Sequence, residues 1–242
     1  FNAIPMNLKS AVSVGIGLFI AFVGLQNAHI VVGGSTLLQL FSVDAYNKAN
    51  GVEASFNNVG ITVILALAGI IITGILVVKN IKGNILWGIL ITWGLGIICQ
   101  FAGLYVPNAD LGFYSLLPDF SKGLSIPSLT PIFGKLQFKG IFSVDFIVIL
   151  FAFLFVDLFD TIGTLVGVSA KADMLDEEGK LPHIKGALLA DAVATTVGAI
   201  LGTSTTTTFV ESASGVSEGG RTGLTAVTTA ILFGLSLFLS PI

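Results

Sequence analysis

Charged residues are few in this sequence. Only 10% of the 242 residues are charged and 54% are hydrophobic, whereas soluble domains carry roughly 25% charged residues. The mean hydropathy, +0.96, lies far above that of a soluble domain. The net charge of −3 gives no reason to expect nucleic acid as a partner. Composition therefore excludes an ordinary soluble domain and predicts a protein whose surroundings are the lipid bilayer.

Cysteine, histidine and catalytic motifs are scarce too. Cys99 is the single cysteine, which excludes an intramolecular disulfide, and no Cys/His cluster indicates a zinc site. His29 and His183 fall at the ends of apolar segments, where a surface or interfacial position is expected. Nucleophile-elbow and P-loop patterns are absent. The stretch Asp160–Gly163 resembles the Asp-Thr-Gly of aspartic proteases, but an isoleucine interrupts it inside a hydrophobic span, so we expect no enzyme.

Long apolar runs account for most of the chain. A membrane-spanning helix needs about 20 predominantly apolar residues. Six runs meet or approach this length and are separated by polar connections. We predict an all-α polytopic membrane protein whose spanning segments cover Leu8–Val32, Val59–Val78, Ile85–Leu104, Val144–Ser169, Ile184–Thr203 and Leu224–Leu239.

Ser204–Gly215, with the sequence STTTTFVESASG, breaks this pattern. It is too short and too polar for an ordinary spanning helix, and its four consecutive threonines favour extended backbone. The residues after them could open a short helix. Such irregular backbone at membrane depth is tolerated only where it lines a cavity or is buried in protein, and discontinuous segments mark transporter binding sites. The alternative is an ordinary extramembrane loop.

The basic residues indicate a topology. Lys9, Lys79, Lys82, Lys171, Lys180, Lys185 and Arg221 lie in or beside short connections, and Lys48, Lys122, Lys135 and Lys139 lie in two long ones. Positive charge in short connections faces the cytoplasm. We therefore expect Ala170–Lys185 to be cytoplasmic and Gly33–Asn58 to be external. This arrangement requires Ser204–Gly215 to cross the membrane, which favours the broken-segment interpretation.

Four acidic residues fall inside apolar segments: Asp157, Asp160, Asp191 and Glu211. An ionisable group at a helix centre costs about 2.5–3.5 kcal/mol on insertion scales, so such groups usually face a cavity, a partner or an ion path. Asp157 and Asp160 are three residues apart on one helix face, and neighbouring carboxylates resist double ionisation. At least one can therefore hold a proton, as a proton-coupled carrier requires; the alternative is a structural pair.

Glu211 lies where the threonine run meets the expected short helix. Its carboxylate can accept two N–H donors from a ligand while nearby backbone N–H groups stay free for ligand acceptors. In an extended strand Phe209 shares a face with Glu211, and an aromatic plane beside a carboxylate suits a flat heterocycle with N–H groups. Alternatively, Phe209 faces lipid or core. For Asp191 we expect a structural contact with Arg221 or with a Ser/Thr side chain.

Four stretches resemble the azaguanine/hypoxanthine–guanine (AzgA-like) purine permease family: Gly17–Gln26, Phe155–Ser169, Leu201–Val216 and Gly219–Phe233. That family belongs to the nucleobase–cation symporters, which share the xanthine/uracil permease fold. The similarity runs in order along essentially the whole chain, and VDLFDT with TSTTTTFVES is its most specific part. The resemblance implies two inverted repeats of seven segments, of which this sequence would be an internal fragment with segments five to eleven. No signal peptide is readable.

The resemblance also implies how the fragment is organised. Residues 1–104 would be gate-domain helices, residues 105–143 an extramembrane connection, and residues 144–242 the half of the core domain that carries the substrate site. The missing N- and C-terminal segments of the same protein would be its partners, and a homodimer is an open alternative.

Matching motifs assign roles to single residues. Glu211 matches the carboxylate that grips the base, and Phe209 and Val210 match strand residues that contact it by ring and backbone. Thr164 stands where uracil-type relatives have a histidine, which shifts proton coupling to Asp160 and Asp157. The expected base-binding residues are Glu211, Asp160, Asp157, Phe209, Val210, Thr164 and Ser212.

We therefore expect a secondary active transporter of the plasma membrane, in bacteria the inner membrane. It would carry purine bases with protons, hypoxanthine and guanine first and adenine next, with the proton as coupling ion and no cofactor or metal. Two other hypotheses stay open. An anion transporter or channel of the same fold would need a cationic or neutral site, against which the acids argue. For a membrane scaffold, the intramembrane acids are an unexplained cost.

Overall fold

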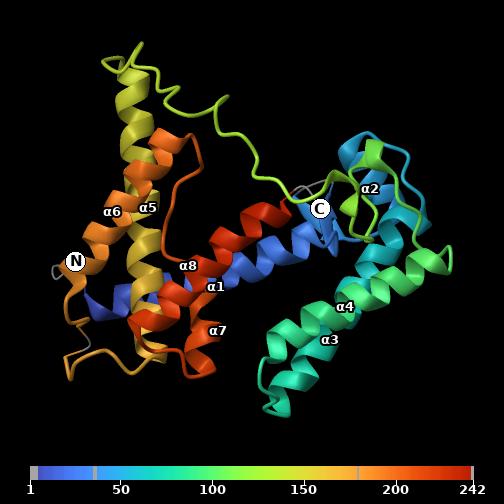
Figure 1. The fold of residues 1–242 in the computed structure, drawn as a ribbon, viewed down its shortest axis with the longest axis horizontal. Coiled ribbons are helices and arrows are strands. Elements are labelled where there is room, and N and C mark those ends of the chain that lie inside the picture. The colour runs from blue at the N-terminus through green and yellow to red at the C-terminus, as the bar shows by residue number, and fades with distance from the viewer. Residues whose placement is uncertain (1–4, 35–36, 179, 241–242) are drawn as a thin grey trace. The chain divides into compact units, whose positions relative to one another are not determined.

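The computed structural model describes residues 5–34, 37–178 and 180–240 and confirms a mostly helical chain. Contacts divide the chain into two compact units, Phe1–Phe19 with Lys122–Pro241 and Ile20–Ser121. The gate and core boundaries implied by the resemblance stay a prediction. The helices are α1 (Met6–Asn27), α2 (Val43–Asn50), α3 (Ile61–Val78), α4 (Asn84–Phe101), α5 (Val144–Lys171), α6 (Ile184–Leu201), α7 (Ser212–Ser217) and α8 (Gly223–Ser236) (Figure 1).

Five of the predicted spans are present as helices that are long and apolar enough to cross a membrane. They cover Ser10–Asn27, Phe56–Val78, Asn84–Phe101, Val144–Lys171 and Ile184–Leu201, and Gly223–Leu239 is a shorter apolar helix. The first span was predicted to reach Val32, but α1 ends at Asn27. His29 takes left-handed backbone, with φ 58°, and Val31–Gly33 then pairs as strand β1 with β2, Leu38–Leu40. The apolar run therefore continues into a hairpin rather than into further helix.

Small residues allow α3 and α4 to approach closely within the unit Ile20–Ser121. A Cβ atom on Gly69 of α3 would lie 2.7 Å from Thr92 Oγ1 of α4. The Thr92 hydroxyl itself donates to the Gly88 carbonyl of its own helix at 2.7 Å. Glycine and threonine contacts of this kind hold helices together in lipid, where the hydrophobic effect contributes little to helix association.

Replacement of Gly69 by valine should therefore separate the two helices. The added side chain overpacks the contact with Thr92, which we expect to cost about 1–3 kcal/mol. Thermal unfolding of the full-length protein in detergent measures the effect. Gly74→Val, on the same helix with nothing within 4 Å of its Cβ position, is the matched control. Equal melting temperatures for the two variants would contradict the close packing.

The two long connections are partly folded. Gly33–Asn58 contains β2 and α2, and a buried cluster joins Val32, Tyr46, Ala54 and Val59 to Tyr105 and Phe113. Asn58 Nδ2 donates to the Val106 carbonyl at 2.7 Å, and the Tyr105 hydroxyl donates to the Tyr114 carbonyl at 2.7 Å. These bonds satisfy polar groups that the cluster buries. Both connections therefore contribute to one small core, which we name the cap.

His29 belongs to the cap and is half-buried. Its ring lies edge-on to Tyr46 at 5.0 Å and to Phe113 at 5.8 Å between centroids. Burial lowers the pKa of His29 from its ordinary 6.5. Above pH 6.5 the side chain is neutral both folded and unfolded. Below it the unfolded chain binds the proton more readily, so the folded cap loses stability as pH falls.

We expect thermal stability to fall as the pH drops from about 7 to about 5, in part because of His29. His29→Asn should reduce this loss, since asparagine tolerates left-handed backbone and does not titrate. The measurement is the melting temperature of the full-length protein across that range. His183→Asn is the control, because His183 has the same φ of 58° and is exposed. A wild-type pH dependence in His29→Asn would contradict the prediction.

Candidate functional site

The chain between α6 and α7 is the irregular segment predicted from the sequence. Residues 203–209 form neither helix nor strand, and Val210 and Glu211 turn into α7. Threonine side chains tie the segment back to α6: the Thr195 hydroxyl donates to the Thr206 carbonyl at 2.7 Å, and Thr203 Oγ1 donates to the Gly198 carbonyl at 3.1 Å. These bonds replace helical hydrogen bonds, as irregular backbone at membrane depth requires. We name residues 203–211 the return segment.

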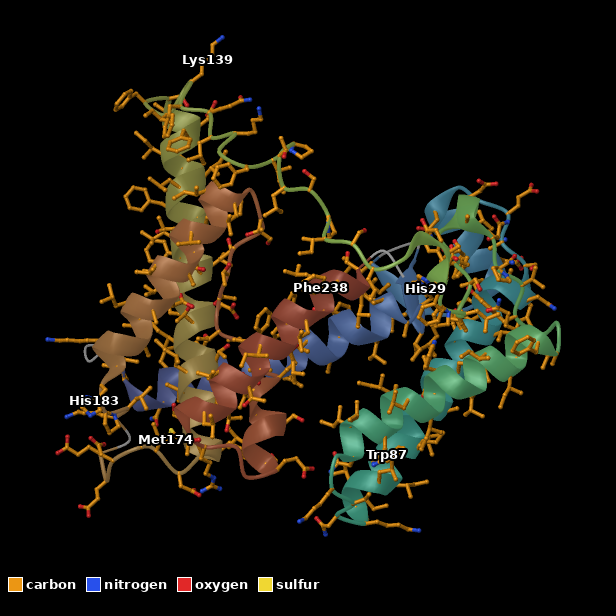
Figure 2. The ribbon with its side chains drawn as sticks, viewed as in Figure 1. His29, Trp87, Lys139, Met174, His183 and Phe238 are labelled. Carbon is orange, nitrogen blue, oxygen red and sulfur yellow. The ribbon has the colours of Figure 1, made fainter. Side chains whose placement is uncertain are left out.

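The return segment runs back alongside α6. It leads to the C-terminal end of α5, the end near which α6 begins. Lys139 lies at one end of α5, and Met174 and His183 lie at the other (Figure 2). Arg221, which follows α7, donates to Asp173 Oδ2 at 3.1 Å and so lies at the second end. The 18 residues of α6 rise about 27 Å at 1.5 Å per residue, and extended backbone advances about 3.3 Å per residue. The short return segment with α7 can therefore reverse the whole crossing (Figure 1).

Thiol labelling in intact cells tests this crossing and its orientation. Single cysteines replace Lys48, Lys139, Glu178 or Thr222 in a cysteine-free full-length background that includes Cys99→Ala. We expect an impermeant reagent to label positions 48 and 139 from outside and to reach positions 178 and 222 only in opened cells. Labelling of 178 but not 48 from outside would reverse the orientation. Labelling of 178 and 222 from opposite sides would contradict the crossing.

The four intramembrane acids belong to the same unit and converge beside the return segment. Asp157, Asp160 and Asp191 are half-buried, and Glu211 is exposed. Asp191 of α6 acts electrostatically on both α5 aspartates, and Glu211 also acts on Asp160. Every charged group that acts on Asp160 is therefore an acid. A cluster of this kind favours protons or hydrogen-bond donors over anions.

A threonine hydroxyl of α5 connects Asp191 of α6 to the return segment. Thr161 Oγ1 donates to Asp191 Oδ2 at 3.1 Å and lies 3.2 Å from Thr207 Oγ1. Of the two contacts expected for Asp191, the structure therefore has the one with a Ser/Thr side chain. The other, with Arg221, was wrong, because Arg221 pairs with the exposed Asp173 at the end of α5.

The ligand-facing residues of the return segment differ in exposure. Phe209 is 59% exposed, Ser212 is exposed and Val210 is half-buried. The expectation that Phe209 and Glu211 share a strand face was wrong, because Glu211 has helical backbone, with φ −59° and ψ −20°. Thr164 is only 2% exposed and lies on the packed face of α5. The roles of all these residues in base binding stay predictions.

Backbone donors beside Glu211 are only partly free. The N–H groups of Ser212, Ala213 and Ser214 donate to carbonyls three residues earlier, at 3.2, 3.0 and 2.9 Å. Among the described residues, the N–H groups of Phe209, Val210 and Glu211 have no acceptor. The buried Thr208 hydroxyl likewise has no partner in the described part of the chain. Unpaired buried polar groups are costly, so the start of the turn is where a ligand with acceptors would be stabilised.

Two grooves of the described residues do not include the four acids. One groove of about 810 Å³ follows α6 past Thr203 and Thr206, and its lining residues include none of the four acids. Another, of about 750 Å³, follows α3 and α4 in the other unit. Both are lined mainly by apolar side chains and glycines, which offer a polar ligand few partners.

Sequence reasoning missed the contacts of Thr161 and Thr207 beside the acids. Thr161 follows Asp160 directly and lies one helical turn from Asp157, so its position on the acidic face was readable. Thr207 was read only as part of a run that favours extended backbone. Which of the four consecutive threonines meets α5 depends on where the segment turns, which the sequence pattern does not specify.

These observations define a polytopic membrane protein with a discontinuous segment beside clustered intramembrane acids. Residues 1–242 match the model of a family described as a permease family, and the chain belongs to this family. It is a multi-pass plasma-membrane protein rather than an enzyme.

Named relatives agree with this assignment. The chain is 43% identical over its full length to a putative permease of Methanocaldococcus jannaschii, of which it covers 49%. It is 42% identical to the guanine/hypoxanthine permease PbuG of Bacillus subtilis, covering 100% of this chain and 49% of that protein. It is 35% identical to the adenine permease AdeP of Escherichia coli, covering 99% and 47%. The chain thus spans about half the length of these relatives.

Proposed function

We propose that the protein containing this chain carries purine nucleobases across the plasma membrane together with protons. The observation that carries the proposal is the convergence of Asp157, Asp160, Asp191 and Glu211 beside a return segment with free backbone N–H groups. The names of guanine/hypoxanthine and adenine permeases among the relatives support purines as the substrate class.

The chemistry of a purine base suits this arrangement. Its N–H groups can donate to the exposed Glu211 carboxylate, and its ring nitrogens and carbonyl oxygens can accept from the N–H groups of Phe209 and Val210. The exposed Phe209 ring can lie against the flat heterocycle. An anion has no comparable partner here, since the groups acting on Asp160 are all acids.

In this proposal the transported proton binds to the carboxyl groups of Asp157 and Asp160 on α5. Asp157 and Asp160 lie close enough to interact electrostatically, and Asp191 adds a third carboxyl group. Three neighbouring carboxylates resist full ionisation in an environment poor in water. Binding of a proton there lowers the local negative charge and lets the loaded carrier cross, which couples base movement to proton movement.

Substitutions separate the two roles in the full-length protein. Glu211→Gln keeps the shape but adds N–H donors that oppose the base, so a charged hydrogen bond worth about 1.5–3 kcal/mol is lost. We expect the affinity for guanine to fall about 10- to 150-fold. Asp160→Asn mimics a permanently neutral acid and should abolish accumulation against a gradient while some binding survives.

The measurements are equilibrium binding of radiolabelled guanine and proton-driven uptake across pH. Glu218→Gln, downstream of α7, is the matched control for the glutamate. Wild-type affinity in Glu211→Gln would refute its role in gripping the base. Normal accumulation with unchanged pH dependence in both Asp160→Asn and Asp157→Asn would refute the proton assignment.

A further inference from the structure

The groove of about 750 Å³ along α3 and α4 belongs entirely to the unit Ile20–Ser121. Its lining residues on α3 recur every three or four positions, the spacing of one helix face, at Thr62, Leu65, Gly69, Thr73 and Val77. From the first to the last of these the helix rises about 23 Å. One leaflet contributes about 15 Å of hydrocarbon to a bilayer. The groove is therefore long enough for a lipid acyl chain over the full depth of a leaflet.

The lining of this groove suits hydrocarbon better than a polar ligand. The Thr62 hydroxyl donates to the Val59 carbonyl and the Thr92 hydroxyl to the Gly88 carbonyl, each at 2.7 Å. Hydroxyls bonded in this way to nearby helix carbonyls have no proton left for a ligand. The indole N–H of Trp93 likewise donates to a backbone carbonyl, that of Leu116, at 3.0 Å. These groups leave an acyl chain with methyl groups and an aromatic ring to contact.

The glycines of the groove argue against a further helix as its occupant. Helices that pair closely in membranes need small residues at their contact. A Cβ atom on Gly69, Gly88 or Gly96 would crowd a side chain of the same unit, so these glycines already serve contacts within the unit. Among the glycines that line the groove, only Gly74 has nothing within 4 Å of its Cβ position. A thin and flexible chain therefore fits the groove better than a helix.

Positive charge marks one end of the groove. Lys79 and Lys82 lie in the turn between α3 and α4, just beyond the end of the groove that Val77 lines. They are the only charged residues between Glu53 and Asp110. Both side chains are exposed, and neither takes part in an ion pair of the described residues. The two ammonium groups are therefore available to an anionic group at the mouth of an apolar groove.

We propose that this groove binds an anionic phospholipid, with an acyl chain along α3 and α4 and the phosphate beside Lys79 and Lys82. Trp87, in the first turn of α4, is exposed at the same end (Figure 2), and tryptophan is enriched at the headgroup level of bilayers. The lysine distribution predicts that this end faces the cytoplasm, where the leaflet is negatively charged. The lysines select the headgroup by its charge, and the groove holds the tail.

Photo-crosslinking of the full-length protein in phosphatidylcholine nanodiscs tests the site. The probes are a phosphatidylglycerol and a phosphatidylcholine that carry the same photoreactive acyl chain. We expect the wild type to crosslink phosphatidylglycerol in preference, at the residues of α3 and α4 that line the groove, as mapped by peptide mass spectrometry. Lys79→Gln combined with Lys82→Gln should lower this preference about 30-fold, because each lysine near an anionic headgroup strengthens binding about fivefold.

Two further variants separate headgroup from tail. Lys135→Gln combined with Lys139→Gln removes the same charge from a long connection and should keep the wild-type preference. Gly74→Phe fills the open part of the groove, and crosslinks of both probes at the lining residues should be lost. The melting temperature of each variant in detergent should match the wild type, because all the replaced side chains are exposed.

Several results would overturn the site. Equal crosslinking of the two probes in the wild type would do so, and so would an unchanged preference in the Lys79/Lys82 variant or unchanged crosslinks in Gly74→Phe. Absence of crosslinks along the groove would show that protein covers it, either segments outside this sequence or a second copy. Displacement of the phosphatidylglycerol probe by an equal concentration of glycerol phosphate would reveal a site for free anions instead.

Discussion

The desolvation of carboxyl groups inside apolar segments is the constraint on which the rest of the site depends. Each such group costs about 2.5–3.5 kcal/mol on insertion scales, and this chain gathers three of them in one unit: Asp157, Asp160 and Asp191. The structure offsets part of this cost at Asp191, because Thr161 Oγ1 donates to Asp191 Oδ2 and lies 3.2 Å from Thr207 Oγ1. Arg221 does not contribute, since it pairs with Asp173 outside the cluster.

The irregular return segment follows from the same constraint. A continuous helix would use its backbone N–H groups internally, and its threonines would commonly bond to their own carbonyls. Where the chain leaves the helix after α6, Thr207 can instead meet Thr161, and the N–H groups of Phe209 and Val210 stay available. The break therefore supplies both N–H donors for a ligand and a hydroxyl partner for Thr161. Its bonds to Thr195 and Gly198 hold it against α6.

In both units, small residues allow neighbouring helices to pack closely. Gly69 lets Thr92 come close within the α3–α4 pair, and Gly167 of α5 lies against Ser13 of α1. In lipid, such contacts and interhelical hydrogen bonds replace the hydrophobic effect as the main source of association. Many large apolar side chains of the spanning helices are accordingly exposed in this chain, as expected for surfaces that meet lipid or further protein segments.

The sequence by itself determined five of the six predicted spans, the broken segment and the acids that need partners, because length, hydropathy and buried charge are properties of single segments. Only the tertiary structure decided that α1 ends at Asn27 and that Asp191 accepts a hydrogen bond from Thr161 rather than pairing with Arg221. It also decided that Glu211 has helical backbone. These outcomes depend on strand pairing, on the depth at which two helices face each other and on where a segment turns. Such long-range contacts are not encoded in any local pattern of residues.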